Sequence, residues 1–130
     1  MKIIRTDSAP AAVGPYSQAT LSNGMVYTSG QIAIDPATGS LVSQDIASQA
    51  EQAIKNLSAV LEAAGSGLTH VVKTTCFLKD MGDFAAFNAV YAKYFTSLPA
   101  RSCVSSPALP KGALVEIEAI AELAPAQDGK

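Results

Sequence analysis

The sequence predicts an α+β domain in which two helices cover one face of a mixed β-sheet. Three patterns support this prediction: a hairpin signal near residue 23, a long amphipathic helix in the middle of the chain, and an alternating strand near its end. The expected order is hairpin, helix, strand, helix and two strands. This order is typical of a helix layer packed against one sheet.

The first predicted element is a β-hairpin. Two extended runs, Ala19–Ser22 and Met25–Ser29, flank the dipeptide Asn23-Gly24. A type I′ turn requires positive φ at both central residues, which Asn and Gly accept readily. The segment Asp35–Gly39, which contains a proline, is then expected to form a turn or loop.

The clearest helix is expected between Ser43 and Ala64. Ser43 can cap its start, with Asp45 in the first turn, and Gly65 supplies the stop. At 1.5 Å per residue this helix would be about 33 Å long, enough to cross a sheet. Its apolar residues recur at helical spacing: Ile46, Ala50, Ala53, Ile54, Leu57, Val60, Leu61 and Ala64.

The second half of the chain is expected to hold three strands and one helix. A strand at Val71–Lys79 is rich in Val, Thr and Phe, and Asp80 then caps a helix over Met81–Phe95. Two strands, Arg101–Ser105 and Leu114–Leu123, close the domain. Aromatic side chains share one face of the helix: Phe84, Phe87, Tyr91, Tyr94 and Phe95.

One face of the sheet is expected to lack a helix cover. In the last strand, one alternating set is wholly apolar and should face the helices, whereas the other mixes Leu and Ile with carboxylates. Val71, Thr75 and Phe77 are likewise expected on the uncovered face. A half-apolar exposed face indicates a subunit interface and hence an oligomer. The two sets are Val115, Ile117, Ala119, Ala121 and Leu123, against Leu114, Glu116, Glu118, Ile120 and Glu122.

Length and composition narrow the class of protein. A chain of 130 residues fits one domain, expected over residues 1–124 with a flexible tail at 125–130. A net charge of −2 without a Lys/Arg cluster disfavours nucleic acid as the main partner. No apolar run is long enough for a signal peptide or a membrane span, so a cytoplasmic location with reduced Cys76 and Cys103 is expected.

Arg101 is the most informative polar residue. It follows a Pro-Ala pair at the start of a predicted strand, so its guanidinium should emerge at a fixed place and share a face with Cys103 and Ser105. An arginine so placed can hold a carboxylate through two parallel hydrogen bonds. The alternative is an ion pair with Glu116 or Glu118.

Glu116 lies on the less apolar face of a strand that could neighbour the Arg101 strand. A partly buried glutamate can orient water or relay a proton, whereas the alternative is a solvated carboxylate. Cys103 has no visible partner for nucleophilic catalysis, because nothing places His70, the only histidine, near it. The usual spacing of metal ligands is missing as well, and no metal site is expected.

Three further positions are candidates for a binding site. Tyr16 follows a rigid Gly-Pro turn and could wall a pocket, while Ser29-Gly30 ends a strand where a ligand could approach backbone N–H groups. Turn formation alone would also explain both segments. Asn88 lies on the aromatic face of the second helix, where its amide needs a hydrogen-bond partner.

Together these segments resemble the RidA/YjgF family of reactive-intermediate deaminases. The resemblance covers about residues 9–123, and seven segments in the same order make it specific although each alone is weak. They are GPYSQA (14–19), YTSGQI (27–32), the long Ala-rich helix, VVKTTCFLKDMGDF (71–84), FNAVYAKYF (87–95), PARSCV (99–104) and LPKGALVEIEAIA (109–121).

The resemblance implies a chorismate-mutase-like fold of the bacillus type, assembled as a homotrimer with sites between subunits. It also implies cofactor-independent hydrolysis of enamine/imine intermediates, in which 2-imino acids such as 2-iminobutanoate and 2-iminopropanoate become 2-oxo acids and ammonia. Arg101 matches the arginine that holds the substrate carboxylate, and Glu116 matches the glutamate that positions or activates water. Positions that line or border the site match Tyr16, Ser29, Gly30, Asn88 and, mainly through its backbone, Cys103.

Two departures from the family pattern flank the expected cleft. Pro107 stands where the strand usually continues, so pairing should be interrupted there or lie at an edge. The segment Thr96–Leu98 is shorter than in many members, and both changes could shift the substrate range.

Two other functions compete with imine hydrolysis. The first is a trimer that binds 2-oxo or carboxylic acids without turnover, as a sensor or regulator. Both readings use Arg101, but only hydrolysis should depend on Glu116. Some family members are also credited with ribonuclease or translation-inhibitor activity, which the acidic balance here disfavours as the main role.

Overall fold

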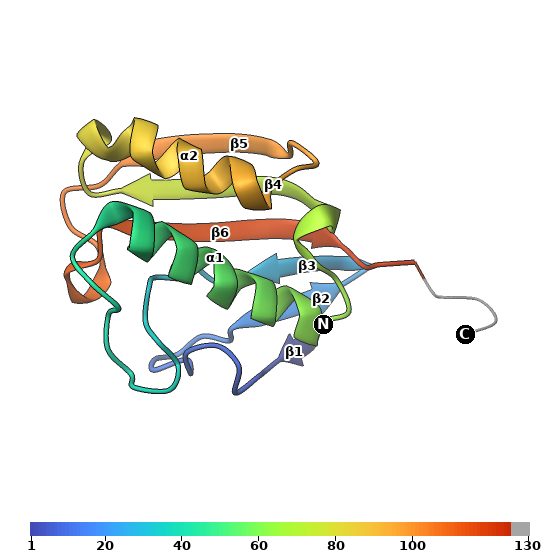
Figure 1. The fold of residues 1–130 in the computed structure, drawn as a ribbon. Coiled ribbons are helices and arrows are strands. Elements are labelled where there is room, and N and C mark those ends of the chain that lie inside the picture. The colour runs from blue at the N-terminus through green and yellow to red at the C-terminus, as the bar shows by residue number, and fades with distance from the viewer. Residues whose placement is uncertain (126–130) are drawn as a thin grey trace.

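The computed structural model describes residues 1–125 and arranges them as a six-stranded sheet with two helices on one face (Figure 1). This confirms the predicted α+β architecture. Residues 126–130 of the expected tail lie outside the described residues. The strands are β1 (Lys2–Ile4), β2 (Ala19–Ser22), β3 (Met25–Thr28), β4 (Val71–Leu78), β5 (Ala100–Ser105) and β6 (Val115–Glu122), and the helices are α1 (Ile46–Ala63) and α2 (Phe84–Tyr94).

The strand order of the sheet is β1-β2-β3-β6-β4-β5. Only β4 and β5 pair in parallel, so the sheet is mixed as predicted. The expectation that the Arg101 strand neighbours the Glu116 strand is wrong, because β4 lies between β5 and β6. The reason is that α2 acts as a crossover between β4 and β5, which makes these two strands parallel neighbours. β6 then pairs with the other side of β4.

The edge position of β5 agrees with the expectation drawn from the proline that follows it. β5 ends at Ser105, and Pro107 falls outside the strand. One further backbone bond, from Ser106 N–H to the Leu78 carbonyl at 2.8 Å, closes the pairing before the chain leaves the sheet. A proline beyond this point removes no donor from the ladder.

Local signals fixed the hairpin and the end of the long helix. Asn23 and Gly24 have φ values of 53° and 77°, as the predicted tight turn requires. Gly65, at φ 87°, follows the last turn of α1. The prediction of Ser43 as the helix cap is wrong: the Asp45 carboxylate accepts from Ser48 N–H at 2.9 Å, and the helix starts at Ile46.

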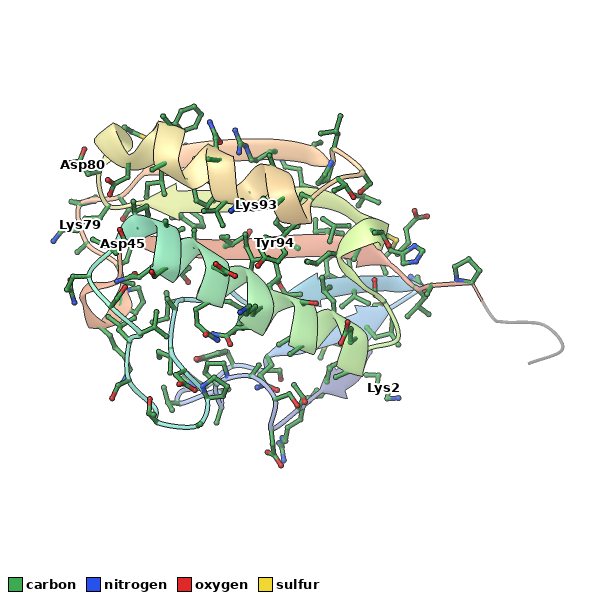
Figure 2. The ribbon with its side chains drawn as sticks, viewed as in Figure 1. Lys2, Asp45, Lys79, Asp80, Lys93 and Tyr94 are labelled. Atoms are coloured by element: carbon green, nitrogen blue, oxygen red, sulfur yellow. The ribbon has the colours of Figure 1, made fainter. Side chains whose placement is uncertain are left out.

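The second helix starts with a 3₁₀ turn over Met81–Asp83, capped by Asp80, whose carboxylate accepts from Gly82 N–H at 2.8 Å. The α-helical part therefore begins only at Phe84, later than predicted. The two caps, Asp45 and Asp80, lie at the same end of the molecule (Figure 2). Between the helices, the Tyr94 hydroxyl donates to Glu51 of α1 at 2.8 Å.

The two faces of the sheet differ in cover, as expected. In β6 the buried set faces the helices: Val115, Ile117, Ala119 and Ala121. Leu123 does not join this set, because β6 ends at Glu122 and Leu123 is exposed. Val71 was expected on the open face but is buried, since an irregularity between Val71 and Lys73 shifts the register.

The open face of the sheet exposes large apolar side chains. Tyr27 on β3 is 44% exposed and Val104 on β5 is 47% exposed.

Neither helix of the described chain has both the length and the apolar character that a bilayer crossing requires.

Two buried polar side chains of α1 tie loops to the helix. Gln49 donates to the Ser43 carbonyl at 2.6 Å and accepts from Leu114 N–H at 2.9 Å. Asn56 donates to the carbonyls of Ile32 and Ile34 at 3.0 and 2.8 Å. These contacts hold the loop between β3 and α1 and the loop between β5 and β6. Both loops line the site described next, so α1 helps to position the walls of that site.

Candidate functional site

Arg101 lies at the start of β5 and is held from two directions by α2. Its Nη1 donates to Asn88 Oδ1 at 2.8 Å. The guanidinium carbon lies 4.8 Å from the ring centroid of Tyr91 and 5.5 Å from that of Phe84. The partner that Asn88 was expected to need is therefore Arg101. We call Arg101, Asn88, Phe84, Tyr91 and Cys103 the arginine cluster.

The guanidinium of Arg101 has no carboxylate partner among residues 1–125. The only ion pair in this part of the chain joins Lys55 and Glu51 on α1. The predicted alternative of an ion pair with Glu116 or Glu118 is therefore wrong for the single chain. A half-buried guanidinium without a counter-ion favours an anionic ligand, and its flat fork of donors matches a carboxylate.

Cys103 lies on the same face of β5 as Arg101 and pairs across the strands with Cys76 of β4. Both thiols are free. Burial raises the pKa of Cys76 to about 12. Burial also raises the pKa of Cys103, against the opposing effect of the nearby Arg101 charge. Neither thiol is thus activated as a nucleophile at neutral pH.

Glu116 lies in a different place, on the wall of an open cavity of about 780 Å³. Tyr16, Ser29 and Gly30 line the same cavity, so the structure brings together four of the predicted site residues. Its other walls come from the loops around residues 10–13, 31–39 and 110–111 and from Glu118. We call this space the glutamate cavity.

Gly30 allows the backbone to pass directly against the Glu116 side chain. A Cβ atom added at Gly30 would lie 2.8 Å from Cδ and 2.9 Å from Cγ of Glu116, and would overlap its carboxylate. The adjacent bridge between Gln31 and Ile117, with N–H to carbonyl distances of 2.8 and 3.0 Å, fixes this approach. The glycine therefore determines where the Glu116 carboxylate can lie.

The charge state of Glu116 depends on its surroundings. Burial raises the pKa of its carboxyl group, and the negative charge of Glu118, two residues along the same strand face, raises it further. A glutamate with a raised pKa exchanges protons closer to neutral pH than a solvated one. The alternative of a fully solvated carboxylate is not what the structure shows, because Glu116 is half-buried.

The N-terminal wall of the cavity depends on hydrogen bonds that the sequence did not reveal. Gln18 is buried, accepts from Thr6 N–H at 2.7 Å and donates to the carbonyls of Thr6 and Pro10 at 3.1 and 2.8 Å. The Ser29 hydroxyl donates to the Ser17 carbonyl at 2.5 Å. Tyr16 is 52% exposed beside these contacts.

The arginine cluster and Glu116 lie on opposite faces of the sheet. Ile117 pairs with Cys76, and Cys76 pairs with Cys103. Paired residues point to the same side of a sheet, so Arg101 and Cys103 share the side of Ile117, under the helices. Glu116, adjacent to Ile117, points to the open side. A single chain therefore does not unite the seven predicted residues in one site.

Metal ligands do not cluster in the described part of the chain. Among residues 1–125, no three His, Cys, Asp or Glu side chains lie close enough together to hold a metal ion.

Known proteins match this chain over most of its length. The family model described as endoribonuclease L-PSP matches residues 6–123. A Rattus norvegicus protein named 2-iminobutanoate/2-iminopropanoate deaminase is 51% identical over 125 residues, which cover 95% of this chain and 91% of that protein. The crystal structure of the E. coli YjgF gene product shares 48% identity at a TM-score of 0.90, covering 94% of this chain and 98% of that one. E. coli TdcF, solved with bound serine, shares 42% identity at a TM-score of 0.91, covering 95% of this chain and all (100%) of that one.

Proposed function

Because this chain belongs to the endoribonuclease L-PSP family, in which the RidA/YjgF proteins fall, we propose that it hydrolyses 2-imino acids to 2-oxo acids and ammonia without a cofactor. 2-Iminobutanoate and 2-iminopropanoate, the compounds named for the rat relative, are the proposed substrates. The observation that carries this proposal is the Arg101 guanidinium, which is half-buried, held by Asn88 and two aromatic rings, and without a counter-ion in the described chain.

The proposed chemistry needs orientation rather than a covalent nucleophile. Arg101 binds the substrate carboxylate and so fixes the imine carbon in one position. Glu116 takes a proton from a water molecule as the water oxygen bonds to that carbon, and the proton passes on to the imine nitrogen. Glu116 next takes the hydroxyl proton of the resulting carbinolamine and returns it to the nitrogen, so the C–N bond breaks as the C=O bond forms, leaving the 2-oxo acid and ammonia. Ser29, Gly30, Tyr16 and the backbone of Cys103 enclose the reacting atoms.

We also propose that the complete site forms between two copies of the chain. Arg101 and Glu116 lie on opposite faces of one sheet, so Arg101 of one subunit would meet Glu116 of the next across a heterologous interface. Such an interface closes into a ring when the rotation allows it. The homotrimer and the chorismate-mutase-like fold name that the sequence resemblance implies fit this arrangement.

The open sheet face supports a second copy as the occupant of that interface. Tyr27, on the strand next to the one that carries Glu116 and Glu118, exposes apolar surface there, and so does Val104 at the far edge of the sheet. An exposed apolar area beside the cavity is expected at a subunit contact.

The two free thiols also fit the cytosolic location expected from the sequence.

Cleavage of RNA, which the family description suggests, suits the site less well. Among residues 1–125, the glutamate cavity is lined by two carboxylates, Glu116 and Glu118, and by one basic side chain, that of Lys111. A phosphate backbone requires a surplus of positive charge. Binding of a small 2-imino acid requires only one cation to hold its carboxylate, and Arg101 would supply it.

The proposed function is tested with imine generated in the assay. A dehydratase releases 2-iminobutanoate from threonine, 2-oxobutanoate formation is followed, and residual imine is trapped with semicarbazide. The wild type should accelerate the reaction, while Glu116→Gln should lose turnover and still bind 2-oxobutanoate. Wild-type protein that binds 2-oxobutanoate without accelerating hydrolysis would instead favour a regulator or sensor.

The pH profile offers a more specific prediction. As a base, Glu116 must be ionised, so kcat should fall as the pH drops through its raised pKa. Replacing Glu118 by Gln removes the neighbouring negative charge and lowers the pKa of Glu116. The acid limb of the kcat profile should therefore move to lower pH in Glu118→Gln and stay in place in the control Glu122→Gln. A limb that does not move, or moves to higher pH, argues against Glu116 as the base.

A further inference from the structure

We propose that Tyr91 is a positioning residue for Arg101, whose ring fixes the plane of the guanidinium for carboxylate binding. This inference rests on the proposed function, because Arg101 is taken as the group that binds the substrate. Tyr91 itself would touch neither the substrate nor the attacking water.

A hydrogen bond and two ring contacts together orient the Arg101 guanidinium. Asn88 Oδ1 accepts one N–H bond from Nη1, which fixes one corner of the guanidinium but leaves its plane free to rotate about that contact. The Tyr91 ring, with its centroid 4.8 Å from the guanidinium carbon, is closer than the Phe84 ring at 5.5 Å. A ring at this distance attracts the cation and restricts its tilt. Four of the five guanidinium N–H groups then remain for a ligand.

The Tyr91 ring is itself held in place on several sides. Its hydroxyl shares a 2.8 Å hydrogen bond with the hydroxyl of Thr74, which is fully buried. Thr74 is the cross-strand partner of Arg101, so the bond anchors the ring directly beside the strand that carries the arginine. Phe95 stacks on Tyr91 at 4.3 Å between centroids with planes 23° apart, and Phe87 packs at 5.7 Å.

The fixed position of the Tyr91 ring should affect binding of the substrate carboxylate more than it affects the chemical step. A free arginine side chain loses rotamer entropy when it binds a ligand, and that loss weakens binding. Here Tyr91 restricts the guanidinium before the substrate arrives. Removing the ring should therefore raise KM and the Kd for a carboxylate, while kcat changes little because Glu116 and its water are untouched.

The test compares Tyr91→Leu with Tyr91→Phe and with Phe87→Leu. Tyr91→Leu should raise KM for 2-iminobutanoate and Kd for 2-oxobutanoate about 5–30-fold, with kcat nearly unchanged. Tyr91→Phe keeps the ring, so KM should stay within about 2-fold of wild type although Tm falls, because Thr74 loses its buried partner. Phe87 packs on Tyr91, whereas the rings that lie against the Arg101 guanidinium are those of Tyr91 and Phe84. Phe87→Leu should therefore lower Tm without raising KM.

The outcomes separate a positioning role from a structural one. A Tyr91→Leu variant with wild-type KM and Kd overturns the inference, as does a Phe87→Leu variant whose KM rises equally. If Tyr91→Leu does not fold, Tyr91→Met replaces the ring with a flexible apolar chain and should show the same rise in Kd. If the wild type fails to hydrolyse the imine, the proposed function fails, while Kd values for 2-oxobutanoate still decide the role of Tyr91.

Discussion

Replacing Arg101 with methionine is expected to lower kcat/KM for 2-iminobutanoate by roughly 10²–10³-fold, because removing one partner of a desolvated charge pair costs about 2–5 kcal/mol. Arg101→Lys should fall between this variant and the wild type, because lysine keeps the charge but not the planar fork of donors. Both effects are measured by steady-state kinetics with imine formed in the assay.

The Arg101 variants should remain folded, with stability lowered by no more than about 3 kcal/mol. The side chain makes no ion pair with residues 1–125, and its contacts with Phe84, Tyr91 and Asn88 are each worth about 1 kcal/mol or less because the side chain is only half-buried. Lys55→Met is the matched control, since it removes a cation of α1 that is paired with Glu51 and does not line the glutamate cavity. An Arg101→Met protein that retains wild-type kcat/KM would remove the carboxylate contact from the account.

Gly30→Ala is expected to reduce activity while leaving the fold intact. The added methyl group would overlap the Glu116 carboxylate, so that side chain must move. A displacement of about 1 Å in a catalytic group can cost roughly 10²-fold in rate. Thermal unfolding should change only slightly, because the three nearest atoms all belong to the Glu116 side chain, which can rotate, and not to the backbone. The prediction is checked by measuring kcat and Tm on the same preparation.

Gly67→Ala provides the control for this substitution. A Cβ atom at Gly67 would meet nothing within 4 Å, and the residue has an extended backbone with φ 176°. Activity and Tm should both stay at wild-type values. Full activity in Gly30→Ala would mean that the position of Glu116 does not matter for turnover.

Features governed by neighbouring residues were predictable from the sequence. Asn23-Gly24 forms the expected turn because only local φ preferences decide it. The apolar stripe of α1 is buried as expected, because helical spacing puts those residues on one side. The cap was misplaced by two residues, since Ser43 and Asp45 are equally good local candidates and the structure uses Asp45.

Features governed by pairing between distant segments were less predictable. The position of β4 between β5 and β6 depends on which edges remain free after the crossover through α2, and local patterns do not contain this information. The short strand β1 was not expected, because three residues give no period that could be recognised. Val71 was assigned to the wrong face because strict alternation cannot foresee a register shift.

The same division applies to the site. The resemblance to a known family indicates Arg101 and Glu116 as site residues. Only the pairing of the strands shows that these two residues lie on opposite faces of the sheet within one chain. The sequence predicts Tyr91 only as part of an aromatic helix face, because no local pattern brings it to Arg101. Gln18 belongs to the GPYSQA segment, yet its role in holding the cavity wall is visible only in its hydrogen bonds.

The central claim is that each site combines Arg101 of one chain with Glu116 of another. Its most direct test is co-expression of Arg101→Met and Glu116→Gln chains with different affinity tags, followed by purification of oligomers that carry both tags. In the proposed trimer with heterologous interfaces, each oligomer that carries both tags would hold both intact groups at about one third of its sites. Mixed oligomers should therefore recover a substantial share of wild-type activity, although each variant alone is inactive. Mixed oligomers no more active than the separate variants would show that both groups must act within the same chain.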